Sequence, residues 1–344
     1  MTARSGPSHT PLPSPRGPLS RAVLDALHTG RPVDDVHAPE PCDAEAGDRA
    51  LALWVLHELH HRGFDGVDPD AEWRPDLLAV RLRLEEHLER TWRARVADAG
   101  ALEGQVPGTD PADDLASSFF AFCDLDDGSP SLARWVQREA TEEKVLALLR
   151  QRSIYHVKEQ DPAMWAVPRV DDEVKAHLVA LASDEYGNGD PHDLHAQLWA
   201  RGVTACGLDA GFAAYVDEAL PEVLEQNALM TMLGLRRRLV PAALGHLAAF
   251  EVTSAVPSRR MVRGLQRLGM PEPMVAYYRE HMEADAVHEQ LAVRLLLGAH
   301  LAAHPEDRAE VFFGAACCLL AEGRTARAVL AHLGAGAPRA EAVA

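Results

Sequence analysis

Two imidazoles and a carboxylate recur at short spacing towards the end of the chain, within the stretch Tyr278 to Gln290. His281, Asp285 and His288 follow the pattern H-x3-D-x2-H, and at about 100° per residue they fall within roughly a 60° arc of one helix face. Such a mixed nitrogen and oxygen set suits a first-row transition metal, iron above all when coordination positions stay open for oxygen. A polar helix face exposed to water would have the same spacing, so both interpretations stay open on this pattern alone.

A second group of candidate ligands, Glu159, Glu185 and His195, lies upstream. In one unbroken helix, Glu185 and His195 would be about 15 Å apart, which is too far for ligands of metals about 4 Å apart. Between them stands G187-N-G-D-P191, whose glycines and proline break a helix and redirect the chain. We therefore predict two helices separated by this break. The alternative is that these residues are only polar groups at two helix ends.

The elements that must position these residues are predicted to be helices. The sequence is rich in Ala, Leu, Arg and Glu and has few β-branched or aromatic residues, which favours helix over strand nearly everywhere. With 344 residues, 47% of them hydrophobic, the chain can bury a sizeable core. The sequence predicts an all-α protein.

Helix boundaries follow from apolar periodicity and from helix breakers. A helix carrying Glu159 is expected to end before Pro162, because the residue before a proline is pushed out of the α region. The other helices that bear on the candidate ligands are expected at 171 or 172 to 186, from near 191 to 201, 227 to about 256 with Pro257 as its limit, 258 to 268, 273 to about 300, and 307 to about 333.

The two ends of the chain differ from the rest in composition. Residues 1–45 contain eight prolines with several Ser and Gly, which predicts a disordered arm, with a short helix at 20–28 as an option. Residues 46–335 are expected to form one helical domain that carries the metal site. The Ala-rich tail, 336–344, is expected to fray.

The charge excludes some classes of partner. A formal net charge of −18 argues against nucleic acid and against an anionic membrane surface, both of which need clustered Lys and Arg. No apolar run approaches the roughly 20 residues of a membrane helix, and the first 20 residues lack the apolar core of a signal peptide. Five scattered cysteines suggest reduced thiols rather than a disulfide framework. We expect a cytoplasmic protein.

Several segments of the sequence resemble the iron-containing redox enzymes of the haem-oxygenase-like superfamily, the haem-oxygenase-like diiron oxidases and oxygenases. The resemblance runs from about Leu51 through Glu322. The segments that carry it are E58-L-H-H-R-G-F-D-G-V67, K158-E-Q-D-P162, D184-E-Y-G-N-G-D-P-H-D-L-H195, F250-E-V-T-S-A-V-P-S-R-R260 and Y278-R-E-H-M-E-A-D-A-V-H288. It implies a haem-oxygenase-like helical bundle.

The resemblance also implies a ligand set and roles for residues near it. Two ferrous ions would be bound, with dioxygen as co-substrate, and Glu185 would bridge them. Tyr186 would donate a hydrogen bond to the oxidant, or would simply pack. The implied metal ligands are Glu159, Glu185, His195, His281, Asp285 and His288. Residues that would line the substrate pocket or support the ligands, unless they serve core packing and helix capping, are Glu251, Thr253, Ser254 and Arg260.

The function that these observations favour is oxidation of a small molecule by a non-haem diiron enzyme. The negative charge favours an amine or an amino-acid-like substrate over a fatty acid. The reaction stays open between N-oxygenation, desaturation, fragmentation and decarboxylation, and an electron donor and a homodimer are both compatible with the sequence. Two alternatives stay open: a relative that binds haem or another cofactor through His57 or His60, and a metal-independent helical protein that acts by interaction.

Overall fold

The computed structural model describes residues 10–33, 45–99, 114–125 and 128–335, without the side chains of residues 283–287. Over these residues the chain is helical and contains no strand, so the all-α prediction is confirmed. The helices are α1 Pro18–Thr29, α2 Ala46–Glu58, α3 Pro75–Asp98, α4 Leu115–Cys123, α5 Leu132–Arg138, α6 Glu142–His156, α7 Asp161–Met164, α8 Asp172–Glu185, α9 His195–Ala205, α10 Pro221–Leu235, α11 Val240–Arg267, α12 Glu272–Gln290, α13 Gly298–Ala303 and α14 Arg308–His332.

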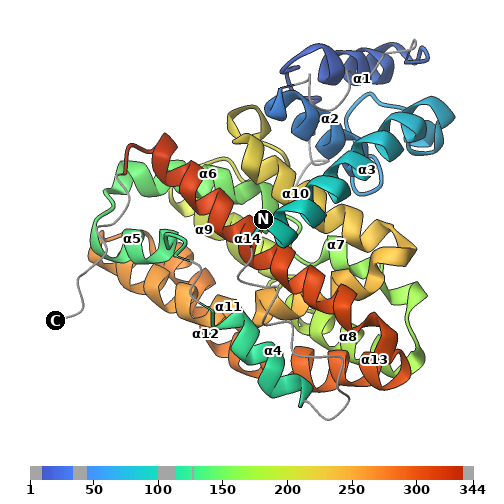
Figure 1. Ribbon diagram of the computed structural model, residues 1–344. Helices are drawn as coiled ribbons and strands as arrows, with labels where there is room; N and C mark the ends of the chain where they lie inside the picture. The colour runs from blue at the N-terminus through green and yellow to red at the C-terminus, as the bar shows by residue number, and fades with distance from the viewer. Residues whose placement is uncertain (1–9, 34–44, 100–113, 126–127, 336–344) are drawn as a thin grey trace.

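Helix α11 is the centre of the bundle. It packs against α14, α12 and α5, while α12 also packs against α9. Figure 1 shows α14 running across the front of the molecule, with α1, α2 and α3 gathered at one end. The main buried apolar cluster extends from α1 and α2 into the bundle, and a second one lies between α4, α8, α11, the segment after α12 and α14.

The closest approach in the bundle is between α11 and α14, and glycines permit it. A Cβ atom on Gly245 would lie 1.9 Å from the carbonyl oxygen of Val311, and one on Gly314 would lie 1.9 Å from that of Ala242. No side chain fits in such a space, so the two backbones can touch only because both positions are glycine. This contact fixes α11, the helix that carries Glu251, against α14.

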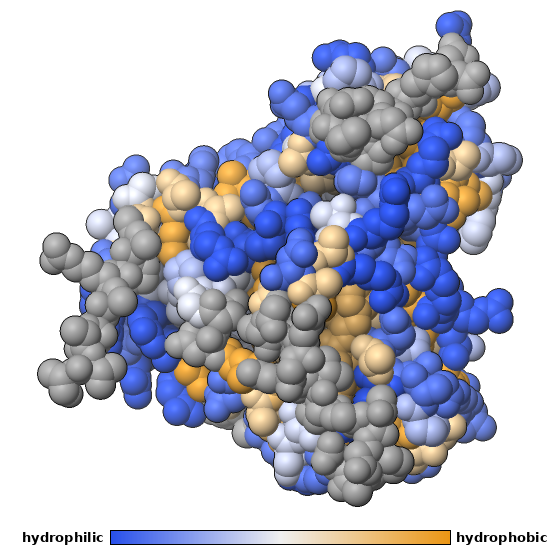
Figure 2. Space-filling model, in the orientation of Figure 1, coloured by the Kyte–Doolittle hydropathy of each residue, from blue (hydrophilic) through white to orange (hydrophobic). Residues whose placement is uncertain are grey.

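Helix α11 is also both long and apolar. The segment Arg237–Arg267 has the length and composition of a membrane-crossing helix, but 61% of its most apolar window is buried inside the fold. The molecular face in Figure 2 is mostly hydrophilic, with separate hydrophobic areas among the charged ones. Both observations are consistent with the core helix of a soluble protein.

Several predicted boundaries were wrong. The helix predicted from 227 to about 256 is divided, because α10 ends at Leu235 and α11 begins at Val240. Helix α11 does not end at Pro257 but continues through it to Arg267. Proline lacks only its own N–H, so the helix loses one hydrogen bond, to the carbonyl of Thr253, while the packing on both sides keeps it helical. The helix predicted from 273 to about 300 is present, as a continuous helical run from Glu272 to Ala303, with a π-helical turn, Leu291–Leu297, between α12 and α13. Such turns are frequent at functional sites.

Part of the predicted disordered arm belongs to the packed fold. Helix α1 spans Pro18–Thr29, and its Leu19 and Val23 are fully buried within the main cluster. Asp48 at the start of α2 accepts hydrogen bonds from the backbone N–H groups of Leu19 and Ser20, which fixes the beginning of α1. The proline-rich composition predicted that the loss of chain entropy on folding would keep this segment disordered. Burial of the apolar stripe of α1 offsets that loss. Residues 1–9, 34–44 and the predicted tail 336–344 lie outside the described part.

Candidate metal centre

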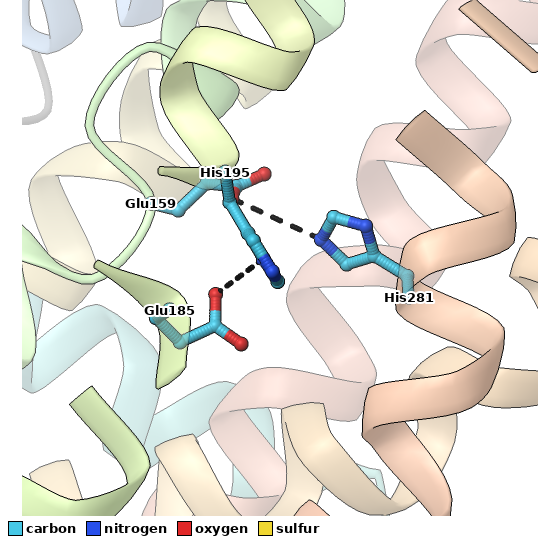
Figure 3. A group of neighbouring side chains, drawn as sticks. All are labelled: Glu159, Glu185, His195 and His281. Carbon is cyan, nitrogen blue, oxygen red and sulfur yellow. Dashed lines mark ion pairs between the residues drawn. The ribbon is translucent and has the colours of Figure 1, made fainter. Parts of the chain in front are cut away.

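Four of the sequence-predicted ligands meet inside the bundle. Glu159, Glu185, His195 and His281 each offer one ligand atom, and these four atoms all lie within 4.8 Å of one another. Figure 3 shows the two carboxylates and His195 approaching from one side and His281 from α12 on the other. The group is shielded from water, because Glu159 and Glu185 are each 9% exposed and His195 is 4% exposed.

Local sequence places Glu185 and His195 at facing helix ends. Helix α8 ends at Glu185 and α9 begins at His195, so the predicted break between them is confirmed. Gly187 has φ +72°, and a Cβ atom there would lie 2.6 Å from the backbone nitrogen of Leu194. Only glycine permits this backbone conformation and this close approach together. The tight turn thus brings two residues that are ten apart in sequence to the same site.

Glu159 does not stand on a helix, contrary to the prediction. Helix α6 ends at His156, and Glu159 follows in a turn before α7. One of its oxygens, Oε1, accepts hydrogen bonds from His156 Nδ1, at 2.5 Å, and from the hydroxyl of Tyr277. The other oxygen, Oε2, is buried and has no hydrogen-bond partner. It therefore faces the site as a free ligand atom.

The ligand atoms are close together without being hydrogen-bonded. Glu159 Oε2 lies 3.9 Å from His195 Nδ1 and 3.8 Å from His281 Nε2. His195 Nδ1 lies 2.8 Å from Glu185 Oε2, yet it lacks the alignment of a hydrogen bond. Ligands about 2.1 Å from a common first-row metal are roughly 3 to 4 Å apart. The spacing is that of atoms that converge on one ion.

A second group of ligands shares Glu185 with the first. It consists of Glu185, Glu251 and His288, again with ligand atoms within 4.8 Å of one another. His288 Nδ1 lies 3.3 Å from Glu185 Oε1 and 3.4 Å from Glu251 Oε2. The opposite ring nitrogen, Nε2, hydrogen-bonds to Asp184 Oδ2 at 2.7 Å. This contact orients the imidazole, as acceptors behind metal-ligating histidines do.

The sequence pattern on α12 is therefore divided between the two groups. His281 belongs to the first and His288 to the second. His281 is oriented by its Nδ1–H, which donates to the carbonyl oxygen of Tyr277 at 2.9 Å. The side chain of Asp285 lies outside the described part of the structure, so its role as a ligand stays a prediction.

In both ligand groups, buried glutamates lie beside histidines, and each kind of side chain shifts the pKa of the other. Burial would raise the pKa of Glu185, but the nearby imidazoles of His195 and His288 outweigh it and lower that pKa to about 2. Burial would lower the pKa of His281, but its contact with Glu159 raises it to about 10. Burial also opposes protonation of His288, whose carboxylate neighbours Glu185 and Glu251 nevertheless raise its pKa to about 11. Protons thus balance the buried carboxylates, which is the role that a bound cation would take over.

A cavity of about 250 Å³ opens onto the ligands. Its wall includes Glu159, Glu185, Glu251 and His281, and it extends between α5, α6, α11, α12 and α14. Thr253 and Ser254 line it, as the sequence predicted for a pocket, but their hydroxyls also donate to the carbonyl oxygens of Ala249 and Glu251 in their own helix. Both the pocket role and the structural role proposed for them are therefore compatible with their positions.

The other two pocket candidates are placed differently. Arg260 is not among the residues that line the cavity, and burial together with Arg134 and Arg138 lowers its pKa. The hydroxyl of Tyr186 donates to Asp161 Oδ1 at 2.8 Å, and the ring is 37% exposed. A catalytic hydrogen bond from Tyr186 would require this contact with Asp161 to break.

In a comparison with protein-family models, residues 146–323 match the family described as iron-containing redox enzymes. The matched stretch is more than half of the chain and contains both ligand groups. The chain belongs to the iron-containing redox enzyme family. The resemblance seen in the sequence is thereby confirmed, and the protein is an oxidoreductase of a haem-oxygenase-like, all-α family. A comparison with curated proteins found no match.

The residues of this iron-containing redox enzyme fit the metal that its family name implies. Glu159 Oε2, His195 Nδ1 and His288 Nδ1 are buried, and none has a hydrogen-bond partner. Such atoms are costly to bury unless something pairs with them. Carboxylate oxygen and imidazole nitrogen form the ligand set that non-haem iron prefers. The unpaired atoms, their convergence on one point and their chemical type all fit a bound iron ion.

Glu251 lines the cavity of this iron-containing redox enzyme, as the sequence predicted. It also lies at ligand distance from His288, a position that the sequence pattern did not indicate. The only sequence signal was an acid on an apolar helix, F250-E-V, which core helices rarely carry without a partner. Tyr277 was not considered at all, although its hydroxyl holds Glu159.

The N-terminal histidines considered as haem ligands are engaged with acids. His57 Nε2 lies 2.8 Å from Glu85 Oε1, and His60 Nδ1 lies 3.1 Å from Glu72 Oε2. Both imidazoles are buried. In this structure they are part of the polar contacts between α2, α3 and the turn between them.

Proposed function

We propose that this protein is a non-haem diiron oxidase or oxygenase that uses dioxygen to oxidise a small organic molecule. Glu185 carries the proposal. Its Oε2 faces His195 and its Oε1 faces His288, so one carboxylate takes part in both ligand groups. A carboxylate shared in this way is suited to bridge two metal ions about 4 Å apart.

The two ligand groups would then hold one ion each. Glu159, His195 and His281 would complete one coordination sphere around Glu185, and Glu251 and His288 the other, with Asp285 as a further predicted ligand. When bound, ferrous iron supplies the electrons and the open coordination positions that dioxygen chemistry requires. The protein keeps these groups out of water and holds their imidazoles in fixed orientations through Asp184 and the Tyr277 carbonyl.

The cavity supports the second half of the proposal. It reaches the carboxylates of both groups, so a molecule bound in it would present one end to the metal ligands. A volume of about 250 Å³ admits a small metabolite and excludes a macromolecule. We further propose a cytoplasmic enzyme that is supplied by an electron donor when the substrate does not provide enough electrons, with a homodimer as a compatible assembly.

Ferrous titration under anaerobic conditions tests the proposal directly. We expect the wild-type chain to bind two ferrous ions and to develop a transient visible absorption when oxygen is admitted. His281→Ala and His288→Ala should each lose binding at their own group, because each removes a nitrogen ligand from one of them. His177→Ala, the same change on α8 outside both groups, should bind as the wild type does.

Two outcomes would contradict the diiron proposal. If the wild type binds close to zero ferrous ions per chain, the protein has no iron site. A Soret band on addition of haem that is lost in His57→Ala or His60→Ala, but kept in His281→Ala, would instead favour a haem-binding relative.

A further inference from the structure

The cavity that reaches the metal ligands also contains an arginine. Arg152 lies on α6, one helical turn before His156, and both residues line the cavity. Four residues of helix rise separate them by about 6 Å, so Arg152 is set back from the ligand Glu159, which follows His156. Its neighbours in the cavity wall include Tyr155, Tyr278 and Glu322.

The guanidinium of Arg152 makes no direct hydrogen bond or ion pair with a described residue. Its Nε is shielded from solvent and unpaired, while burial, which lowers the pKa of Arg152, is outweighed by Tyr278 and Glu322 nearby. Two other buried cations among the described residues have direct partners, Lys158 with Glu58 and Arg81 with Glu85. A buried charge without a direct partner is costly, and arginine cannot relieve the cost by losing its proton. The position of Arg152 thus makes sense when an anion enters the cavity.

The guanidinium group determines which kind of molecule Arg152 can bind. Its planar fork binds carboxylates through two parallel hydrogen bonds, and the cavity is large enough for an organic acid of a few carbons. Glu322 stands at the same part of the wall, with Oε1 accepting from Gln226 Nε2 at 2.5 Å. Its negative charge favours a single carboxylate over a dianion, and it can accept from an ammonium group beside that carboxylate.

We propose that Arg152 anchors a carboxylate of the substrate, so that the substrate is a small organic acid held by its acid end with its other end against the metal ligands. That the bound molecule is a substrate rests on the proposed oxidase function. The anchoring itself concerns only the cavity and does not require iron. Arg152 therefore determines which molecules bind, and how they lie, without being a metal ligand.

Matched six-carbon probes test the anchor by calorimetry, on metal-free and on ferrous-loaded protein under anaerobic conditions. The probes are hexanoate, L-norleucine, hexylamine and hexanol. We expect hexanoate and L-norleucine to bind to the wild type and the two probes without a carboxylate to bind at least ten-fold more weakly. Arg152→Gln should weaken both acids by about ten-fold or more, since a hydrogen bond to a charged group contributes about 1.5 to 3 kcal/mol.

Three controls separate loss of the anchor from a general loss of charge and from unfolding. Arg150→Gln removes a charge from the same helix, where Arg150 lies 3.5 Å from Glu218 and is 41% exposed, and should bind the acids as the wild type does. Arg152→Lys keeps the charge but loses the fork, and should retain part of the affinity. Ferrous stoichiometry should be unchanged in Arg152→Gln, which also reports that the variant is folded.

The outcomes divide cleanly. Equal affinity of the wild type and Arg152→Gln for both acids, including no measurable affinity in either, would overturn the anchor. Tighter binding of hexylamine than of hexanoate would overturn it too, because the cavity would then select cations. If the wild type binds no iron but still binds the acids in a way that depends on Arg152, the oxidase function is refuted and the anion site is retained.

Discussion

At the scale of single residues, the centre is defined by what each carboxylate oxygen faces. Glu159 gives Oε1 to His156 and Tyr277 and keeps Oε2 for the site. Glu185 presents one oxygen to each ligand group. Glu251 faces His288 from α11. These carboxylates differ in their partners, so they are not interchangeable, although all are glutamates.

Glu251 gives the sharpest prediction at this scale. Glu251→Gln should weaken one of the two ferrous sites by at least about ten-fold, because even residues that only support a ligand have effects of that size. Anaerobic titration with chelator competition measures the two affinities separately. The control is Glu280→Gln, an exposed acid on α12, which should leave both unchanged. If both sites in Glu251→Gln bind as tightly as in the wild type, Glu251 is not a ligand.

At the scale of elements, the turn between α8 and α9 creates the first ligand group. Gly187 and Gly189 both have positive φ, +72° and +91°, but only at Gly187 would a Cβ atom collide with backbone, 2.6 Å from Leu194 N. The difference separates the conformational requirement of the turn from its steric requirement. It also provides a matched pair of substitutions.

We expect Gly187→Ala to destabilise the metal-free protein more than Gly189→Ala. Both changes carry the cost of a left-handed conformation, about 1 to 2 kcal/mol, and only Gly187→Ala adds a backbone clash. Urea unfolding measures the difference, and ferrous titration should show weaker binding for Gly187→Ala because Glu185 and His195 move apart. Equal unfolding free energies for the two variants would show that the turn relaxes without strain.

At the scale of the whole molecule, the N-terminal helices support the metal centre from outside the family match. Glu58 at the end of α2 forms a buried ion pair with Lys158, the residue before Glu159, with side chains 0% and 1% exposed. The family match begins at residue 146, so Lys158 lies within it and Glu58 does not. This pair ties α2 to the turn that presents a ligand.

Breaking the pair from one side should be severe. Glu58→Gln should cost about 3 to 5 kcal/mol of unfolding free energy, because it leaves the Lys158 ammonium buried and alone. Adding Lys158→Met should restore part of that loss, since no unpaired charge then remains. Chemical denaturation of the two single variants and the double variant measures the coupling. If the double variant is as unstable as the sum of the single ones, the two charges do not depend on each other.

The sequence alone determined what depends on neighbouring residues. Residue composition predicted an all-α chain, the glycines between Glu185 and His195 predicted the break that the structure contains, and the helical spacing of His281 and His288 placed both on one helix. These are local properties, because backbone preference and helical periodicity are set within a few residues.

Only the tertiary structure decided what depends on distant contacts. Burial kept α1 folded within a proline-rich stretch of sequence, and packing carried α11 through Pro257. The meeting of Glu251 with His288, and the placement of Arg152 in the cavity wall, depend on helices that are far apart in sequence. An acid or an arginine in a helix has the same local pattern whether it faces water, a metal or a substrate. Which of these it faces is set by the helices packed around it.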